Sequence, residues 1–265
     1  MKTVIIAGMP RSGTSWLGQI VNSVPSVLFR TEPLFSYRFK NQLDVNSSCS
    51  EINDFLSALI DLDDDFILQK QNHADGYYPD FQHSSATTLA FKTTRHHELL
   101  ERYLCCAENI HIIGIVRHPC GSINSWFKSY REFEKQNCNQ ARDWRTGECR
   151  KTSVGEYWGF DDWLAVTRKF VELAETHKNF HLLRYSDLVA DSLQCVEALF
   201  ESTGMPMTRQ TREFLADCHT RHDQNPYSVF KTKTVVDDWK VELNPSIAET
   251  IIGDTKAAGL GYFLV

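Results

Sequence analysis

The sequence predicts an α/β protein, a single doubly wound parallel sheet with a phosphate-binding loop of the P-loop type and a helical cap. Short apolar, β-branched runs alternate with amphipathic stretches along all 265 residues. A glycine turn between Gly8 and Gly13 joins the first apolar run to the first amphipathic stretch. Because no internal repeat, low-complexity segment or linker interrupts the alternation, we expect one domain over residues 1–265.

The composition is that of a globular chain with a substantial core. Hydrophobic residues make up 42% of the chain and charged residues 23%, and the formal net charge is −6. This balance argues against a broad surface for nucleic acid or anionic membrane, and no run reaches transmembrane length. The apolar run after Met1 is too short for a signal-peptide core. We therefore expect a cytoplasmic protein.

The eight cysteines are scattered and show no C-x-x-C spacing. In a cytoplasmic chain such cysteines are expected to be reduced, buried thiols. The spacing also argues against a zinc site. The sequence therefore predicts neither a disulfide framework nor a metal centre.

Residues 3–7 predict the first strand, and the residues after the glycine turn predict a helix. Gly8 and Gly13 allow the backbone to turn tightly and to present its N–H groups, while the start of the helix near Thr14 adds positive partial charge. The turn therefore predicts an anion site. The apolar face of the helix consists of Leu17, Ile20, Val21 and Val24.

The loop departs from the pattern G-x-x-x-x-G-K-[ST] of ATP- and GTP-binding proteins. Thr14 stands where that pattern has its lysine, and the cation of the loop is Arg11. A metal-dependent small-molecule or nucleoside kinase on the same scaffold is the first alternative function, and the missing lysine argues against it. A catalytically silent nucleotide-binding protein is the second.

Residues 27–31 predict a second strand that ends at Glu32 and Pro33. Ligands of parallel α/β sheets lie at the carboxyl ends of the strands, so Glu32 should point toward the anion site. A carboxylate in that place is a candidate general base. The alternative is that Glu32 only forms an ion pair with a nearby arginine.

Residues 34–85 predict an insertion that caps this edge of the sheet. A helix is expected from Glu51, with Ser50 as its N-cap. Aromatic side chains of the cap and of the later chain could line an acceptor pocket or pack beneath the cap, and both readings remain open. They are Phe35, Tyr37, Tyr77, Tyr78, Trp144 and Trp158.

Residues 89–92 and 112–116 predict two further strands, the second a continuous apolar run typical of a strand covered on both faces. A helix should follow, and Ser125 lies eight residues after Arg117, about two helical turns. Arg117 and Ser125 could therefore converge on one anion. The inward face of that helix is expected to comprise Ile123, Trp126, Phe127 and Tyr130.

Residues 131–156 are charged and show little apolar periodicity, which predicts a mobile flap. A long amphipathic helix over 160–174 and a strand over 180–185 follow. Further helices are expected from Leu193, from Thr208 and after Asn244.

Seven short motifs follow one another in order over most of the chain. They are P-R-S-G-T-S-W at 10–16, R-T-E-P at 30–33, K-T-T-R at 92–95, I-V-R-H-P at 115–119, R-Y-S-D-L-V at 184–189, D-W-K-V-E-L at 238–243 and the closing G-L-G-Y. As an ordered set, which is more specific than any one motif, they resemble the motifs of the sulfotransferases that use 3′-phosphoadenosine-5′-phosphosulfate (PAPS).

The resemblance implies a role for each matching residue. Tyr185 would lie near the base of the nucleotide and Trp16 would flank its adenine, while Arg117 and Ser125 would hold its 3′-phosphate. The 5′-phosphosulfate would be bound by the loop residues Arg11, Ser12, Gly13, Thr14 and Ser15.

Three departures separate the chain from single branches of the family. Arg11 and the K-T-T-R motif resemble the corresponding motifs of the carbohydrate and tyrosylprotein enzymes. The tryptophan of G-T-S-W instead resembles the motif of the cytosolic enzymes. The histidine of the cytosolic K-T-H motif is replaced by Thr94, which leaves Glu32 as the preferred base and His96 or His97 as alternatives. The C-terminal R-K-G clamp is absent, with Lys231 and Lys233 as possible substitutes.

The implied reaction is in-line transfer of a sulfuryl group from PAPS to a hydroxyl, or alternatively an amine, of a small-molecule or sugar acceptor. Adenosine 3′,5′-bisphosphate would be the other product. Glu32 would remove the acceptor proton, while Arg11 and Ser15 would stabilise the charge on the sulfuryl oxygens and the leaving phosphate. No metal is expected to take part, and neither nucleic acid nor membrane is an expected partner.

Overall fold

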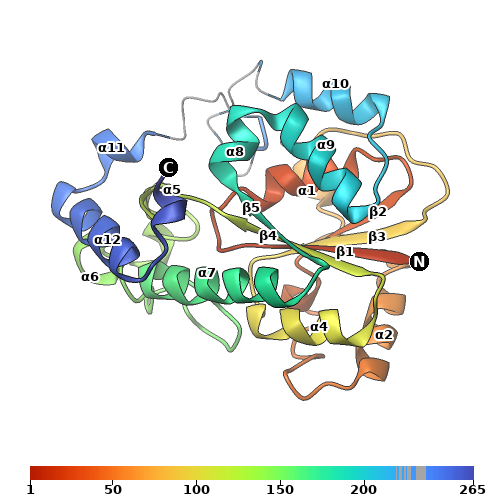
Figure 1. The fold of residues 1–265 in the computed structure, drawn as a ribbon, viewed down its shortest axis with the longest axis horizontal. Coiled ribbons are helices and arrows are strands. Elements are labelled where there is room, and N and C mark those ends of the chain that lie inside the picture. The colour runs from red at the N-terminus through yellow and green to blue at the C-terminus, as the bar shows by residue number, and fades with distance from the viewer. Residues whose placement is uncertain (219, 221–222, 224, 226–227, 231–236) are drawn as a thin grey trace.

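The computed structural model describes residues 1–218, 220, 223, 225, 228–230 and 237–265. Five parallel strands form one sheet in the order β2-β3-β1-β4-β5 (Figure 1). The chain moves from β1 outward to β2, returns to β3, and then continues on the other side of β1. This change of direction confirms the doubly wound topology. The strands are β1 Lys2–Ala7, β2 Val27–Thr31, β3 Thr88–Thr93, β4 Ile110–Val116 and β5 Phe180–Arg184.

Helices cover both faces of the sheet. In Figure 1, α1, α8 and α9 lie over one face, whereas α2, α4 and α7 lie over the other. The helices are α1 Thr14–Asn22, α2 Cys49–Ala58, α3 Lys70–Ala74, α4 Leu100–Cys106, α5 Pro119–Phe127, α6 Gln140–Asp143, α7 Gly159–Thr176, α8 Tyr185–Ala190, α9 Ser192–Thr203, α10 Arg209–Asp217, α11 Trp239–Glu242 and α12 Pro245–Ala257.

The position of β1 in the middle of the sheet explains why residues 4–7 of this strand are all apolar. Ile5 and Ala7 belong to the hydrophobic cluster on one face, and Val4 and Ile6 to the cluster on the other. All four side chains are fully buried. A strand covered on both faces cannot alternate apolar and polar residues, because every second polar side chain would lose its water.

The boundaries differ from the sequence predictions at three places. Helix α2 is capped by Ser48, whose hydroxyl accepts from the N–H of Glu51 while the Glu51 carboxylate accepts from the N–H of Ser48, so Ser50 is not the cap. Tyr130 lies beyond the end of α5 and is 61% exposed, not inward. Tyr185 begins α8 instead of ending β5.

The prediction that all eight cysteines are reduced thiols was wrong. Disulfides join Cys49 to Cys106 and Cys138 to Cys149, with Cα atoms 5.1 and 5.4 Å apart. Disulfides persist in oxidising compartments, so the step from an expected cytoplasmic location to reduced thiols does not hold for these four cysteines. In the part of the chain that the structure describes, no helix is long and apolar enough to cross a membrane. Cys105, Cys120, Cys195 and Cys218 take part in neither of these two disulfides.

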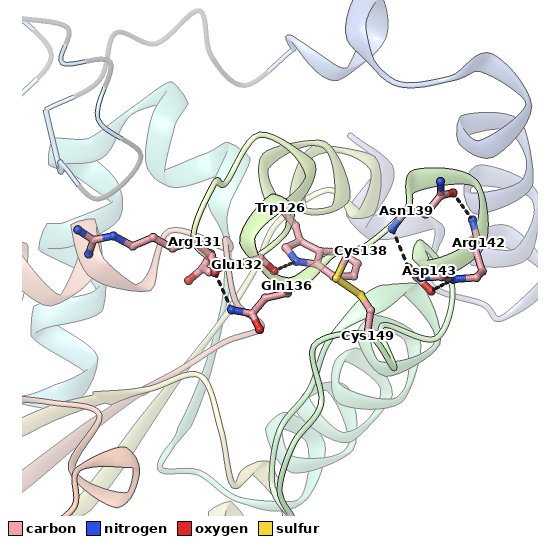
Figure 2. Close-up of a disulfide and its surroundings, with 9 residues drawn as sticks. All are labelled: Trp126, Arg131, Glu132, Gln136, Cys138, Asn139, Arg142, Asp143 and Cys149. Atoms are coloured by element: carbon pink, nitrogen blue, oxygen red, sulfur yellow. Dashed lines mark hydrogen bonds and ion pairs between the residues drawn. A yellow bond between two sulfur atoms is a disulfide. The ribbon is translucent and has the colours of Figure 1, made fainter.

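The segment 131–156 contains a short 3-10 helix, Glu134–Gln136, and α6. The Cys138–Cys149 disulfide closes its middle part (Figure 2). Arg95 forms a buried ion pair with Glu156 and a β-bridge to it, which ties the far end of the segment to the chain after β3. The predicted flap is therefore held at several points. Its mobility stays a prediction.

Candidate active site

The glycine loop connects β1 to α1 at the carboxyl edge of the sheet. Gly13 has φ +93°, and an added Cβ there would lie 2.5 Å from two ring carbons of Tyr185. A Cβ on Gly8 would lie 2.8 Å from the Thr14 side chain and 2.9 Å from Ile115. A side chain at either position would therefore clash with neighbouring atoms, and at Gly13 the backbone conformation also favours glycine. The Ser12 hydroxyl is buried and has no hydrogen-bond partner among the described residues, as expected of a group reserved for a ligand.

Arg11 is the cation of this loop, and its backbone also adopts the left-handed conformation, with φ 68°. Its Nε donates to the Ser125 hydroxyl at 3.2 Å, and its Nη1 lies 3.6 Å from Oε2 of Glu132. Non-glycine residues in this region of φ are uncommon and often occur at functional sites. The geometry thus brings two predicted residues together, Arg11 and Ser125, and adds Glu132.

Arg117 lies against the other side of the loop. Its Nη1 donates to the backbone carbonyl of Arg11 at 3.1 Å, and its guanidinium carbon lies 5.0 Å from the centre of the Tyr185 ring. Tyr185 in turn packs edge to face with Trp16, at 6.1 Å between ring centres. The fold therefore gathers Arg117, Ser125, Trp16 and Tyr185 around the loop, and the roles that the resemblance implies for them stay predictions.

The Arg117 guanidinium is buried beside a second guanidinium, that of Arg11. Its Nε has no hydrogen-bond partner, and no carboxylate lies within 4 Å of it, among the residues that the structure describes. Burial lowers the pKa of Arg117 and Arg11 adds to this effect, while Tyr185 and Asp238 oppose it without outweighing it. A buried cation is costly unless an anion pairs with it. The pair of arginines therefore favours an anionic ligand.

Glu32 follows β2 and is buried, with φ 46°. Its Oε1 accepts from Lys92 Nζ at 3.2 Å and from the Thr94 hydroxyl at 2.9 Å, and the Thr94 N–H donates to both carboxylate oxygens. Burial alone would raise the pKa of Glu32, but Lys92, Thr94 and Arg95 together outweigh burial and lower it. The side chain is therefore an ionised carboxylate at neutral pH. Glu32 does form an ion pair, but its partner is Lys92 and not an arginine, as the alternative had expected.

A cleft of about 210 Å³ joins Arg11 of the loop to Glu32, and its lining does not include Arg117, Ser125, Trp16 or Tyr185. It is bordered by Arg11, Thr14 and Ser15 of the loop and by Glu32. Its other charged lining residues are Lys92, Arg95, Glu132 and Arg150, and its aromatic ones are Phe35, Phe66, Tyr78 and Trp158.

Three of the six aromatic residues singled out from the sequence line this cleft, namely Phe35, Tyr78 and Trp158. Tyr37 is fully exposed, and Trp144 stacks on Phe160 in the core. Both open readings, pocket lining and packing, thus apply to different members of the set. Tyr77 packs at the edge of the core on the α1 side.

The alternative bases His96 and His97 do not line the cleft. His97 is fully buried against Tyr157 and Phe170, and burial lowers its pKa to about 4. His96 contacts the Glu98 carboxylate through Nδ1 at 3.1 Å. Neither ring therefore faces the place where an acceptor would lie. The possible clamp residues Lys231 and Lys233 lie outside the described residues.

Sequence reasoning missed Glu132, Arg150 and Phe66 as lining residues. They come from the cap and from the predicted flap, where no motif or periodicity marks them. Their place depends on how these segments fold over the sheet.

A family model described as "Sulfotransferase domain" matches residues 1–256. No curated protein sequence matches the chain.

Similar solved structures include mouse sulfotransferase SULT7A1 complexed with PAP, with a TM-score of 0.59 and 15% identity over 99% of this chain and 88% of that chain. A sulfotransferase from Alicyclobacillus acidocaldarius has a TM-score of 0.56 and 11% identity over 100% of this chain and 96% of that chain. Retinol dehydratase in a complex with retinol and PAP has a TM-score of 0.55 and 13% identity over 97% of this chain and 80% of that chain. At such low identity the likeness concerns the fold.

Proposed function

The chain belongs to the sulfotransferase family, and on that premise we propose how its residues transfer a sulfuryl group from PAPS to a small-molecule hydroxyl. The family match identifies a PAPS-dependent sulfotransferase. The observation that supports the assignment of residues is the buried guanidinium of Arg117, which has no ion pair within 4 Å among the described residues and lies beside Arg11 at the glycine loop.

At the donor end, Arg117 and Ser125 would bind the 3′-phosphate, with Trp16 and Tyr185 beside the adenine. This assignment is supported by their common place around the loop. Ser125 now accepts from Arg11, so a phosphate arriving there would replace that contact. A guanidinium binds phosphate through two parallel hydrogen bonds, which gives direction as well as charge.

At the reacting end, the 5′-phosphosulfate would be held by Arg11, the N–H groups of residues 12–15 and the Ser15 hydroxyl. Donors placed before the reaction stabilise the charge that develops on the sulfuryl oxygens and on the departing phosphate oxygen. The acceptor oxygen would attack sulfur opposite the phosphate, in line with the bond that breaks. No metal is assigned a part in this proposal.

Glu32 would take the acceptor proton as the new oxygen–sulfur bond forms. Its place in the cleft and its ionised state support this role. Its contacts also limit it, because Lys92 and Thr94 occupy its oxygens in this structure. An acceptor hydroxyl would have to share one of them.

The aromatic lining favours an acceptor that presents a ring or an apolar face, with a hydroxyl toward Glu32. Retinol and androsterone, which are named with retinol dehydratase, are ring-bearing alcohols of this kind. A sugar face or an amine would use the same cleft. A screen of such acceptors would begin with ring-bearing alcohols.

A thermal-shift comparison of ligands without metal tests the donor site. At about 100 times its dissociation constant, adenosine 3′,5′-bisphosphate (PAP) should stabilise the fold by about 2.7 kcal/mol. For a chain of this size that corresponds to a rise in Tm of about 5 to 10 °C. PAP should raise Tm, whereas 5′-AMP should have a smaller effect. A rise with ATP and Mg²⁺ but none with PAP would favour the kinase alternative.

Glu32→Gln tests the base. The variant should still bind PAP, but its turnover with PAPS and an acceptor found in the screen should fall by a factor of about 10² to 10⁴. Unchanged turnover would remove Glu32 from this role.

A further inference from the structure

Glu132 is a second carboxylate in the cleft, and it is paired with the catalytic arginine of the loop. Its Oε2 lies 3.6 Å from Nη1 of Arg11, and the two side chains are 22% and 16% exposed. Both residues line the cleft that also contains Glu32. The ion pair is therefore largely shielded from water, where charges interact more strongly than at the surface.

The fold holds Glu132 in this place. Its backbone carbonyl accepts a hydrogen bond from the buried indole Nε1 of Trp126 at 2.9 Å (Figure 2). The next residue, Phe133, is buried against Trp126, and the Cys138–Cys149 disulfide closes the chain that follows. Figure 2 shows Glu132 between the Trp126 ring and Gln136, on the loop that leaves α5. These contacts hold Glu132 close to Arg11.

The two carboxylates of the cleft differ in their partners. Glu32 accepts from Lys92 and Thr94. The Oε2 atom of Glu132 is buried, and in the part of the chain described here no hydrogen-bond donor reaches it. Its ion pair with Arg11 is thus a contact at 3.6 Å, beyond hydrogen-bond distance. Such a contact is readily given up when a better anion reaches the guanidinium.

We propose that Glu132 is a specificity-determining residue that competes with the donor for Arg11. The inference rests on the proposed function, in which Arg11 binds the 5′ anion of the donor. Any anion that uses Arg11 must first displace the Glu132 carboxylate, and the negative charge of Glu132 opposes its approach. An anion that reaches Arg11 alone is therefore disfavoured, whereas a donor that is also anchored at Arg117 can displace Glu132.

The test measures PAP affinity by isothermal titration calorimetry at one fixed ionic strength, for the wild type, Glu132→Gln and Glu134→Gln. Glu132→Gln should bind PAP about three- to tenfold more tightly, which is the range expected for release from one partly buried ion pair. Glu134 lies two residues away, is exposed and does not line the cleft. Its substitution removes the same charge and should leave PAP affinity unchanged.

A double-mutant cycle with Arg11→Gln separates direct competition from a general electrostatic effect. Arg11→Gln should weaken PAP binding, and adding Glu132→Gln to it should bring no further gain. The inference is overturned if Glu132→Gln leaves PAP affinity unchanged or lowers it, or if its gain is the same with and without Arg11. If the wild type does not bind PAP at all, the proposed function fails first and this inference fails with it.

Discussion

Replacing Gly13 by alanine should disrupt both the fold and the donor site, and the structure gives the size of the effect. An alanine at φ +93° costs about 1 to 2 kcal/mol, because a Cβ in the left-handed region crowds the backbone. The same Cβ would lie 2.5 Å from the Tyr185 ring, and overlap of this kind in a packed site costs about 1 to 3 kcal/mol. We expect a total loss of about 2 to 5 kcal/mol in the free energy of unfolding. PAP binding should be lost as well, because Tyr185 must move.

Gly76 provides a matched control. It has φ +70°, and an added Cβ would meet no atom of the described residues within 4 Å. Gly76→Ala should therefore lose only the backbone part, about 1 to 2 kcal/mol, and should bind PAP normally. Urea unfolding followed by circular dichroism gives the free energies, and calorimetric titration gives the affinities. If the two variants were equally stable and bound PAP equally well, the packing of Tyr185 against Gly13 would have no energetic role.

Three further predictions concern the charges and the disulfide. Arg117→Ala should weaken PAP binding by about 2 to 5 kcal/mol, the usual effect of removing one partner of a buried charge pair; normal affinity in a titration would refute the 3′-phosphate assignment. The pKa of Glu32 is lowered in the folded chain, so its ionised form stabilises the fold above its ordinary pKa of about 4.3, and this contribution is lost as the pH falls through the lowered value. Urea unfolding should therefore show Glu32→Gln less stable than the wild type at pH 7, with the difference shrinking below about pH 4; a constant difference would contradict the linkage. Replacing Cys138 and Cys149 by serine should lower the free energy of unfolding by about 3 kcal/mol, measured against the unreduced wild type, and no loss would show that the closed loop does not constrain the unfolded chain.

The sequence alone located those residues whose position in the fold is set by residues nearby along the chain. The second strand lies where the sequence placed it, at 27–31, because apolar, β-branched runs between turns are a local signal. The start of α1 at Thr14 follows from the glycine turn before it. Arg117 and Ser125 both contact Arg11 of the loop, because one follows a strand and the other lies two turns into the next helix. The carboxyl edge of a parallel sheet then brings these local features together.

The tertiary structure decided which side chains contact one another. The sequence indicated that Glu32 would point toward the loop, but not that Lys92 and Thr94 would occupy its oxygens. The cysteine pairs, 57 and 11 residues apart, could not be chosen from spacing, because a disulfide forms only where two Cα atoms come within about 7 Å.

Glu132 is the clearest case of a residue that only the folded chain reveals. It lies in a charged segment without periodicity, and its contact with Arg11 spans 121 residues of sequence. The sequence determined the fold class, the loop and the family, since these follow from local propensity and from motifs in order. Which carboxylate faces which guanidinium was decided by long-range packing, since ion pairs depend on distances in space that no local pattern encodes.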